Sequence, residues 1–457
     1  MILTYTLKPI PRSVFRAYDI RGIIGDALDE SSYYQIGKAI ACRLYALARE
    51  TVYVAQDGRL TSPSLTKALI EGLLESGISV IDLGVAPTPV MYFATNMGSI
   101  DSGLMVTGSH NPADYNGIKM VLAGKSLVQE DIDILYNTVQ QGQYIEGVGH
   151  YSQQNILARY KARVVSDIVL QRPLKVVVDA GNGVAGPIIP EVLAQLGCDV
   201  IPLFCDIDGR FPNHHPDPTI EENLDALKEA VLAHGADIGL ALDGDADRLG
   251  VVTNTGEMIF PDRLMIMYAK DVLSRNSGAA IVYDVKCTHH LKNAIDAMGG
   301  RALMCPTGHS IVKGVMREEN ALLAGEMSGH LFFKERWYGF DDAIYSACRL
   351  LEIISQSIKS ASDQFQEIPN SINTPEIKIP IDDKTKFEFM EKFCEQADFP
   401  EGRRVTIDGL RVEFDKGWGL LRASNTTPCL VARFEADDEA SLQQIQEAFF
   451  TQIKRLS

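Results

Sequence analysis

The chain has 457 residues, of which 46% are hydrophobic, and it carries a formal charge of −17 at pH 7. This length can bury several hydrophobic cores, so we expect two to four domains. The acidic balance and the lack of basic runs argue against nucleic acid or an anionic membrane as a partner, so an anionic ligand requires a local group of cations.

Targeting and cysteine patterns favour a cytoplasmic protein. Residues 1–16 lack the apolar core of a signal peptide, and no segment approaches membrane-spanning length. The eight cysteines are scattered without a CxxC pair, which is typical of reduced thiols. We therefore expect neither a disulfide framework nor a cysteine-based zinc site.

The first segment, predicted to form a domain over residues 1–154, displays an isolated serine. A helix is expected at 64–75, and strands are expected at 52–55, 78–83 and 103–106. The last strand runs into Thr107–Pro112, where a glycine before Ser109 permits a turn and the proline stops regular structure. A further turn can return the cation of Lys119 toward this hydroxyl. Ser109 is thus a candidate nucleophile or phosphoryl carrier.

The second segment, residues 155–256, brings three carboxylates to the end of a strand. Strands are expected at 175–178, 199–203 and 238–242, with helices near 187–196 and 224–233. Asp243, Asp245 and Asp247 follow the last strand, and alternate spacing lets all three point to one place. Such close anions repel one another unless a cation lies between them. Hard oxygen ligands favour Mg²⁺, and Arg248 follows at once.

The rest of the chain adds two further polar loops. In residues 257–368, strands at 280–283, 301–304 and 321–324 accompany a helix at 291–298, and the last strand ends in Glu326–His330. Residues 369–457 read as a smaller α+β domain with strands at 409–414 and 430–434 and a helix at 442–453. Its loop Arg422–Pro428 combines a cation, hydroxyls and an amide that can bind phosphate. Alternating strands and helices predict α/β domains, and loops beyond the C-terminal ends of parallel strands should face one cleft.

Together these loops and the opening segment Phe15–Gly22 resemble the α-D-phosphohexomutase family, within it the bacterial phosphomannomutase/phosphoglucomutase branch. The resemblance covers nearly the whole chain. It implies three similar mixed or parallel α/β domains and a smaller C-terminal α+β domain around a central cleft. It also implies reversible phosphoryl transfer between C1 and C6 of mannose or glucose phosphates, through a phosphoserine and a 1,6-bisphosphate intermediate.

The same resemblance implies cofactors, partners and residue roles. One Mg²⁺ and a catalytic trace of hexose 1,6-bisphosphate are expected, in an enzyme that supplies nucleotide-sugar precursors for polysaccharides. A monomer is the default expectation for the oligomeric state. Ser109 would be the phosphoserine and would share the metal with Asp243, Asp245 and Asp247. The residues expected to bind substrate are Tyr18, Lys286, His309, Glu326, Met327, Ser328, Gly329, His330, Arg422, Ala423, Ser424, Asn425 and Thr426. Lys119 and His330 are the candidates for general acid and base, assisted by Arg21, Arg248 and His309. A lysine base would need a lowered pKa.

Turnover would require the bisphosphate to reverse its orientation between the two transfers. We therefore expect the C-terminal domain to move on a hinge near residues 366–372.

Three other readings compete. Gly181–Gly186 follows a strand, opens a helix and fits a dinucleotide fingerprint with Asp206 downstream, which would suit an NAD-linked oxidoreductase, although a tight turn explains it better. Asp243 could be the nucleophile of an aspartyl phosphatase, but Asp247 departs from that motif. The pairs His214-His215 and His289-His290 suggest metal, yet neighbouring side chains of an extended chain point apart, so we expect ordinary loops.

Overall fold

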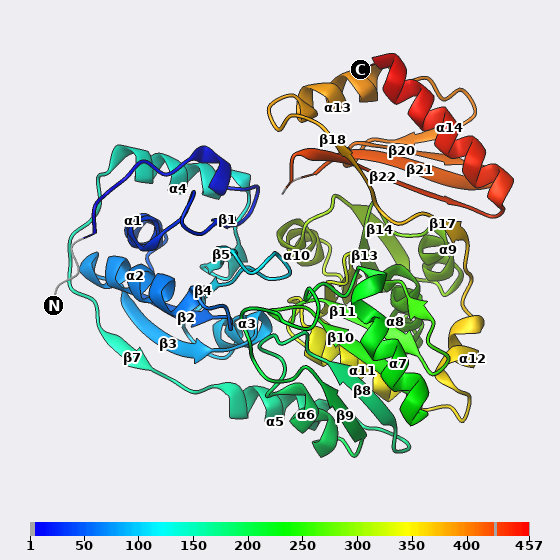
Figure 1. The fold of residues 1–457 in the computed structure, drawn as a ribbon, viewed down its shortest axis with the longest axis horizontal. Helices are drawn as coiled ribbons and strands as arrows, with labels where there is room; N and C mark the ends of the chain where they lie inside the picture. Colours follow the sequence, from blue (N-terminus) through cyan, green and yellow to red (C-terminus); the bar gives the residue numbers. More distant parts are fainter. Residues whose placement is uncertain (1–4, 425–426, 457) are drawn as a thin grey trace. The chain divides into compact units, whose positions relative to one another are not determined.

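Figure 1 presents a computed structural model of the chain, which describes residues 5–424 and 427–456. The chain divides into two compact units. The first unit comprises Met1–Pro261 and Ser328–Gln366, and the second comprises Asp262–Met327 and Glu367–Ser457. Residues 328–366 therefore pack with the first unit, although sequence reasoning grouped them with the strands at 280–304.

The first sheet of the first unit has the strand order β1-β5-β4-β2-β3-β7, with β6 paired to β5. Strands β2, β3, β4 and β7 run parallel, whereas β5 is antiparallel to both β4 and β1. The strands are β1 (Ile20–Ile23), β2 (Thr51–Gln56), β3 (Ser79–Val85), β4 (Gly103–Val106), β5 (Tyr115–Leu122), β6 (Lys125–Ser126) and β7 (Tyr151–Gln153).

Helices cover both faces of this sheet. Val52 and Val54 share one core with α1, α2 and α4, so the intervening side chains of β2 face α3. Figure 1 shows α1 and α2 together on one side of β2 and β3. The helical segments here are η1 (Arg12–Val14), α1 (Glu30–Ala46), α2 (Ser62–Glu75), α3 (Thr88–Asn96) and α4 (Gln129–Gln141).

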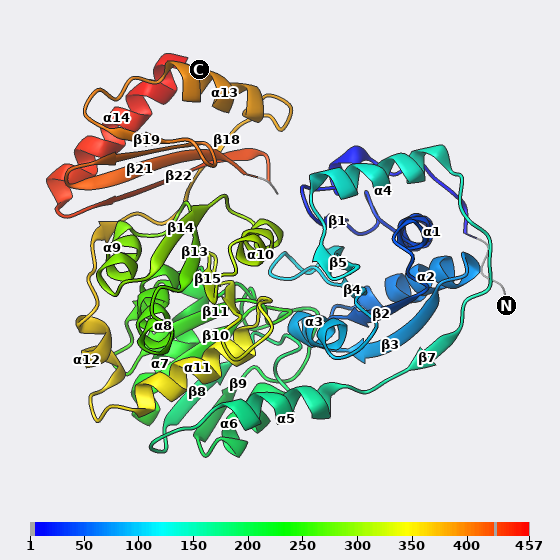
Figure 2. The same ribbon diagram turned by 180° about the vertical axis from the view of Figure 1, so that it is seen from behind.

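The second sheet of the first unit has the order β12-β11-β10-β8-β9. Strands β8, β9 and β10 are parallel, and β11 returns antiparallel to β10. Helix α7 packs on Val177 and Ala241, and α11 contacts β10 and β11. Figure 2 shows α11 on the side of this sheet that is seen from behind. The strands are β8 (Lys175–Asp179), β9 (Asp199–Leu203), β10 (Ile238–Leu242), β11 (Leu249–Thr253) and β12 (Met258–Ile259). The other elements are α5 (Leu157–Asp167), α6 (Ile189–Gln195), η2 (Glu221–Leu224), α7 (Asp225–His234), β16 (Leu331–Phe333), α11 (Ala343–Ser355) and α12 (Ala361–Gln366).

The second unit contains a parallel sheet and an antiparallel one. Strand β13 lies between β14 and β15, all parallel. The antiparallel sheet has the order β17-β22-β21-β20-β19, with β18 also paired to β22. Helices α13 and α14 cover one face of it (Figure 1), and Trp418 on the other face packs against Val285.

The bounds in the second unit are as follows. Its helices are α8 (Pro261–Arg275), α9 (His289–Ala297), α10 (His309–Glu318), α13 (Lys386–Gln396) and α14 (Glu439–Leu456). Its strands are β13 (Ala280–Asp284), β14 (Arg301–Cys305), β15 (Leu323–Gly325), β17 (Ile372–Asn373), β18 (Ile377–Pro380), β19 (Arg403–Val405), β20 (Leu410–Phe414), β21 (Gly417–Ala423) and β22 (Cys429–Ala436).

The expected α/β class is confirmed, and each predicted strand has a counterpart within a few residues. Several helices escaped sequence reasoning, and α1 is the longest of them in the first unit. Its polar residues Ser32, Gln35 and Lys38 are buried together with apolar ones, so the helix lacks a clean apolar stripe.

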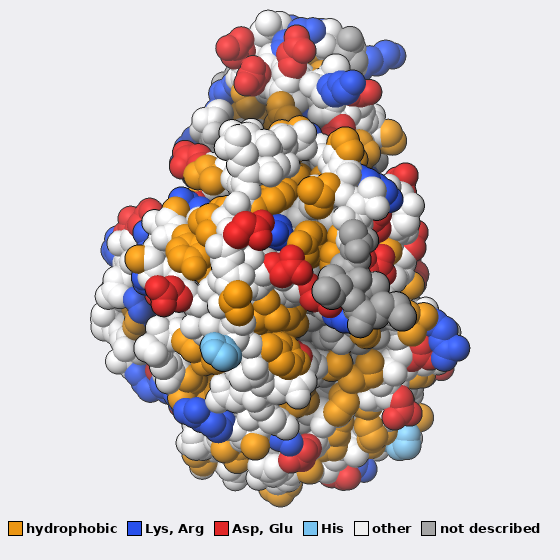
Figure 3. Space-filling view, turned by 90° about the vertical axis from the view of Figure 1, so that its left-hand side faces the viewer, with side chains coloured by type: hydrophobic (Ala, Val, Ile, Leu, Met, Phe, Trp, Pro, Cys, Tyr) orange, Lys and Arg blue, Asp and Glu red, His pale blue; other side chains and the backbone are white. Residues whose placement is uncertain are grey.

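The described surface is mixed in charge and composition. On the face seen in Figure 3, acidic and basic side chains are interspersed with apolar ones. No helix within residues 5–424 and 427–456 is long and apolar enough to cross a membrane. All eight cysteines lie within the described residues as free thiols.

Candidate functional site

Ser109 lies in a strained turn at the end of β4. Its φ of 49° is in the left-handed region, which a non-glycine residue adopts only when its surroundings impose it. Its N–H donates to the Thr107 hydroxyl at 2.8 Å. Its own hydroxyl lies 3.0 Å from a carboxylate oxygen of Asp243. The turn therefore aims the serine at the acidic loop that follows β10.

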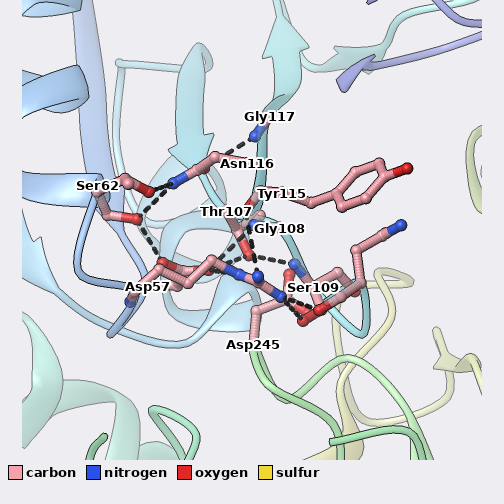
Figure 4. A network of polar contacts seen from close by, with 12 residues as sticks. Asp57, Ser62, Thr107, Gly108, Ser109, Tyr115, Asn116, Gly117 and Asp245 are labelled. Carbon is pink, nitrogen blue, oxygen red and sulfur yellow. Dashed lines mark hydrogen bonds and ion pairs between the residues drawn. The ribbon is translucent and has the colours of Figure 1, made fainter. Parts of the chain in front are cut away.

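A buried pair after β2, Asp57 and Arg59, fixes this turn. Asp57 accepts hydrogen bonds from the Thr107 hydroxyl at 2.8 Å and the Gly108 N–H at 3.0 Å, and Figure 4 shows these contacts together with Ser62. The Arg59 guanidinium donates to the carbonyl oxygens of Ser109, Asn111, Pro112 and Tyr115. Sequence reasoning missed both residues, although they too follow a parallel strand of the first sheet.

The three aspartates converge as the spacing predicts. Asp243, Asp245 and Asp247 are fully buried, and one carboxylate oxygen from each lies within 4.8 Å of the others. Asp243 accepts hydrogen bonds from the N–H groups of Asp247 and Arg248, which tightens the loop around its carboxylate. Ala246, with φ of 64°, makes the sharp turn between them.

This cluster fits a hard divalent cation. Burial and the charges of Asp245 and Asp247 raise the pKa of Asp243 well above its ordinary value, which reflects the cost of three buried anions in one place. One oxygen of Asp245 is buried without a hydrogen-bond partner among the described residues. Three carboxylates within reach of one another form the ligand set that Mg²⁺ prefers.

Lys119 reaches the same cluster from β5. The pairing of Met105 with Lys119 across β4 and β5 brings its ammonium 3.5 Å from the Ser109 hydroxyl, 2.7 Å from Asp245 and into contact with Asp247. Burial alone would lower the pKa of Lys119, but the attraction of these carboxylates outweighs it and raises the pKa above its usual range. The lowered pKa that a lysine base would need is therefore not found in this arrangement.

His330 approaches the acidic loop from the other side. Its Nε2 lies 3.2 Å from a carboxylate oxygen of Asp247 and 3.4 Å from Nε of Arg248. Its Nδ1 lies 2.9 Å from the Ser328 hydroxyl, which orients the ring. Gly329 between them has a φ of 91° and its carbonyl accepts the Leu249 N–H, so this segment is tied to β11.

Arg21 and Tyr18 lie on the opening segment of the same unit. Arg21 donates to the side chain of Asn111 at 2.7 Å and to Asp19 at 2.6 Å. Asn111 is two residues from Ser109, so Arg21 borders the serine turn. Tyr18 is half-buried beside them in the chain.

The second unit holds the other candidate residues. Lys286 pairs with Glu376 at 2.7 Å and lies 3.7 Å from Asp284, and its charge, more than any other cause, lowers the pKa of Glu376 to about 2. Glu326 accepts the Gly308 N–H at 2.7 Å, just before His309 begins α10, and Met327 donates its N–H to Asp284. Sequence reasoning missed Glu376 and Asp284.

The loop after β21 is described only in part. Arg422 donates to Asp408 at 2.8 Å, and Ala423 ends the strand. The hydroxyls of Ser424 and Thr427 are 2.7 Å apart. Asn425 and Thr426 lie outside the described residues. Burial lowers the pKa of Arg422, but Asp408 and other carboxylates raise it on balance, so it is a firm cation.

The glycine-rich turn Gly181–Gly186 serves packing. A Cβ on Gly183 would lie 2.7 Å from the carbonyl oxygen of Gly244, and one on Gly186 would lie 2.0 Å from that of Cys205. The turn thus packs against the backbone of the acidic loop at Gly244. His214, which follows in the chain, pairs with Asp179 at 2.9 Å in the same region.

Comparison with known proteins decides among these readings. Four family models match consecutive parts of the chain, described as phosphoglucomutase/phosphomannomutase alpha/beta/alpha domains I, II and III and C-terminal domain, over residues 12–146, 145–256, 260–372 and 376–452. The chain belongs to the phosphoglucomutase/phosphomannomutase family. The expected family and the expected four-domain α/β architecture are thereby confirmed.

Relatives of this phosphoglucomutase/phosphomannomutase family member extend over its full length. A phosphomannomutase/phosphoglucomutase of Pseudomonas aeruginosa is 53% identical over 97% of this chain and 96% of its own. A phosphoglucomutase of Neisseria gonorrhoeae is 47% identical over 97% of both chains. The crystal structure of a family protein from Burkholderia thailandensis superimposes with a TM-score of 0.94 at 48% identity and covers 98% of each chain.

Proposed function

We propose that this protein is a phosphohexomutase that moves a phosphoryl group reversibly between C1 and C6 of mannose or glucose phosphates. The observation that carries the proposal is the 3.0 Å contact between the Ser109 hydroxyl and Asp243, inside a cluster of three buried aspartates and a buried lysine. The names of the full-length relatives support the same substrate class.

In this proposal Ser109 carries the phosphoryl group. A hydroxyl of the bound sugar phosphate attacks the phosphorus, the bond to Ser109 Oγ breaks, and a base accepts the hydroxyl proton. The resulting 1,6-bisphosphate turns over, Ser109 takes the phosphoryl group from the other end, and an acid returns a proton to the sugar oxygen. Such a transfer depends on alignment and charge neutralisation. Mg²⁺ on Asp243, Asp245, Asp247 and the serine phosphate would neutralise the charge of the transferring group.

Lys119 and His330 are the proposed acid and base. Both contact Asp247, and Lys119 also reaches the Ser109 hydroxyl, so both are held beside the group that transfers. Arg248 adjoins the metal loop and Arg21 the serine turn, where their guanidinium groups can bind phosphoryl oxygens. His309 is proposed to assist from the second unit.

The second unit would recognise the sugar and the distal phosphate. We assign the ring hydroxyls to Glu326 of the second unit and Ser328 of the first, in the substrate-binding loop that also contains Met327 and Gly329. The distal phosphate is assigned to Arg422 and the residues that follow it, Ala423, Ser424, Asn425 and Thr426. Lys286 is assigned to substrate binding.

Further assignments accompany this proposal. We propose domains at 1–154, 155–256, 257–368 and 369–457, supported by the similar limits of the four family models. A catalytic trace of hexose 1,6-bisphosphate would keep Ser109 phosphorylated. We also propose that the protein is a cytoplasmic monomer that supplies polysaccharide precursors. The eight free thiols accord with that compartment.

The test is turnover of mannose 1-phosphate and glucose 1-phosphate with Mg²⁺ and a trace of bisphosphate. Ser109→Ala should lower the rate by at least a thousandfold with an unchanged circular dichroism spectrum, whereas Ser64→Ala, an exposed serine of α2, should leave it unchanged. Intact-mass measurement should detect one phosphoryl adduct that Ser109→Ala lacks. Near-normal turnover by Ser109→Ala would remove the serine from the reaction.

A further inference from the structure

A histidine pair that the reaction does not use lies beside a buried glutamate in the second unit. His289 and His290 begin helix α9, and Glu435 lies on β22. One ligand atom from each of the three residues lies within 4.8 Å of the others. Sequence analysis could not predict this grouping, because 145 positions of chain separate the histidine at 290 from the glutamate at 435.

The start of the helix brings the two imidazoles together. Their ring centroids are 4.1 Å apart, whereas the side chains of neighbouring residues in an extended strand point to opposite faces. Thr288 caps the helix by accepting the His290 N–H, which fixes the backbone at this point. The expectation of an ordinary loop at His289-His290 was therefore wrong about the geometry.

Glu435 supplies a fixed negative charge. It is 1% exposed, its Oε1 lies 2.9 Å from Nδ1 of His289, and it accepts the Thr288 hydroxyl at 2.7 Å. These contacts hold the carboxylate in place beside the histidines.

The histidines offer ring nitrogens as ligand atoms close to the Glu435 carboxylate. A neutral imidazole offers a nitrogen lone pair, and a change of tautomer frees the other nitrogen without net loss of a proton. Ser371 lies 2.6 Å from Nε2 of His290 and can orient that ring.

We infer that His289, His290 and Glu435 form a second metal site, specific for zinc-class divalent transition ions. Two imidazoles and one carboxylate suit Zn²⁺, Co²⁺ or Ni²⁺, whereas Mg²⁺ prefers an all-oxygen shell. His289 is partly exposed and borders a surface cavity of about 170 Å³, which gives an ion a path of entry and room for a water ligand.

The site would join three segments of the second unit. The histidines lie in the part matched by the domain III model, and Glu435 lies in the part matched by the C-terminal model. Ser371 lies in the stretch 366–372 that we predict to be a hinge, and its hydroxyl approaches both His290 and Glu435. A bound ion would hold these segments together. If the proposed mutase function requires the hinge to move, zinc-class ions will inhibit turnover from this site.

Metal binding is tested first, independently of activity. Full-length protein is stripped with a chelator, dialysed into excess Mg²⁺ to fill the aspartate cluster, and titrated with Co²⁺ while its visible absorption is recorded. We expect one Co²⁺ per chain with a dissociation constant in the micromolar range, displaced by Zn²⁺. His289→Gln and His290→Gln should each weaken binding at least tenfold, and His150→Gln, an exposed histidine of the first unit, should not.

The outcomes separate this site from the aspartate cluster. Equal Co²⁺ affinity in wild type and in the double variant His289→Gln/His290→Gln would overturn the proposal, as would no binding at 100 micromolar. Loss of Co²⁺ binding in Asp245→Asn with retention in the double variant would assign the ion to the aspartates and would also overturn it. Both histidine variants keep Glu435 and its bonds to Thr288, so the fold should be preserved.

A turnover measurement then tests whether an ion bound at this site restrains the hinge. With saturating Mg²⁺, Zn²⁺ should inhibit the wild type at concentrations at least tenfold lower than those needed for the double variant. Equal inhibition of the wild type and the double variant would overturn the proposal that an ion at this site restrains the hinge. A protein that binds Co²⁺ through the histidines but turns over no hexose phosphate would refute the proposed function and leave the metal site intact.

Discussion

At the scale of single residues, Arg59 is the clearest case of a side chain that acts through others. It is 1% exposed, and its guanidinium donates to carbonyl oxygens on both sides of the serine turn, including that of Ser109 at 2.8 Å. A Cβ on Gly108 would lie 2.4 Å from the same guanidinium, so the backbone of the turn packs directly against Arg59. Arg59 is therefore a positioning residue.

Replacement of Arg59 by lysine should lower turnover by ten- to a hundredfold with a smaller change in KM. Lysine keeps the charge but not the planar fork of donors, so carbonyl oxygens of the turn lose their partners and the reacting group is misaligned. The unfolding free energy should fall by about 3 kcal/mol. Steady-state kinetics and urea denaturation measure the two effects.

A matched control separates this effect from loss of charge in general. Arg210 forms an ion pair with Asp208 on the surface, where its side chain is 73% exposed, so Arg210→Lys should leave stability unchanged within the error of the measurement. Unaltered kcat in Arg59→Lys, with normal hydrogen exchange in residues 107–112, would show that the serine turn holds its shape without the fork.

At the scale of secondary-structure elements, helices α1 and α2 make a close contact through two glycines. A Cβ on Gly72 would lie 2.2 Å from the carbonyl oxygen of Tyr34, and one on Gly37 would lie 2.5 Å from that of Leu69. The obstacles are backbone atoms, which cannot rotate away. The two helices can therefore approach this closely only with glycine at both positions.

Gly72→Ala should destabilise the protein by about 2 kcal/mol, because overpacking outweighs the higher helix propensity of alanine. Gly314→Ala in α10 is the control, since no atom lies within 4 Å of the added Cβ. This second change should raise stability by up to about 1 kcal/mol. Chemical denaturation of both variants measures the difference, and equal effects would mean that α1 and α2 separate at little cost.

Helix α11 should make stability depend on pH through its N-cap, Asp342. Burial raises the pKa of Asp342 to about 7, although the Tyr345 N–H, the Tyr160 hydroxyl and the Trp337 indole all donate to it. In the unfolded chain the same carboxyl ionises near 3.8. Between these two values the folded protein binds more protons than the unfolded chain, so stability falls as pH rises from about 4 to about 7.

Within that window the unfolding free energy should fall by on the order of 1 kcal/mol per pH unit. Below pH 4 and above pH 7, Asp342 should no longer make stability depend on pH. Asp342→Asn cannot ionise, so its stability should vary less between pH 4.5 and pH 7.5 than that of the wild type. Urea denaturation at both pH values measures the change. Parallel pH profiles for the two proteins would mean that Asp342 is already ionised in the folded state at pH 4.5.

At the scale of the whole molecule, the candidate residues are divided between the two units. Ser109, the three aspartates, Lys119 and His330 belong to the first unit, and Lys286, Glu326 and Arg422 belong to the second. The chain crosses between the units three times, at residues 261/262, 327/328 and 366/367, and the last crossing lies within the predicted hinge.

Substrate should therefore alter the arrangement of the domains. We expect the radius of gyration from X-ray scattering in solution to decrease when glucose 1,6-bisphosphate is added to wild-type protein. Arg422→Ala should reduce that decrease at equal ligand concentration, because the distal phosphate loses its firm cation. Identical scattering with and without ligand, at a concentration that saturates turnover, would rule out the hinge.

The sequence by itself determined the family, the α/β class and the residues directly after three strands. Local rules suffice for these features: strand ends are visible as apolar runs, and Ser109 and the alternating aspartates follow within a few positions. The predicted loop at His289-His290 was wrong, because the prediction depended on an extended backbone that the start of α9 does not provide.

Only the tertiary structure decided which distant side chains act on those residues. Arg59 donates hydrogen bonds to a turn that lies fifty positions further along the chain. Glu376 pairs with Lys286 over a separation of ninety positions, and Glu435 lies beside a histidine pair about 145 positions earlier. The pKa of Lys119 is raised because β5 returns it to the aspartates, a consequence of strand pairing. Such contacts depend on how separate segments pack, and no local pattern of residues encodes that packing.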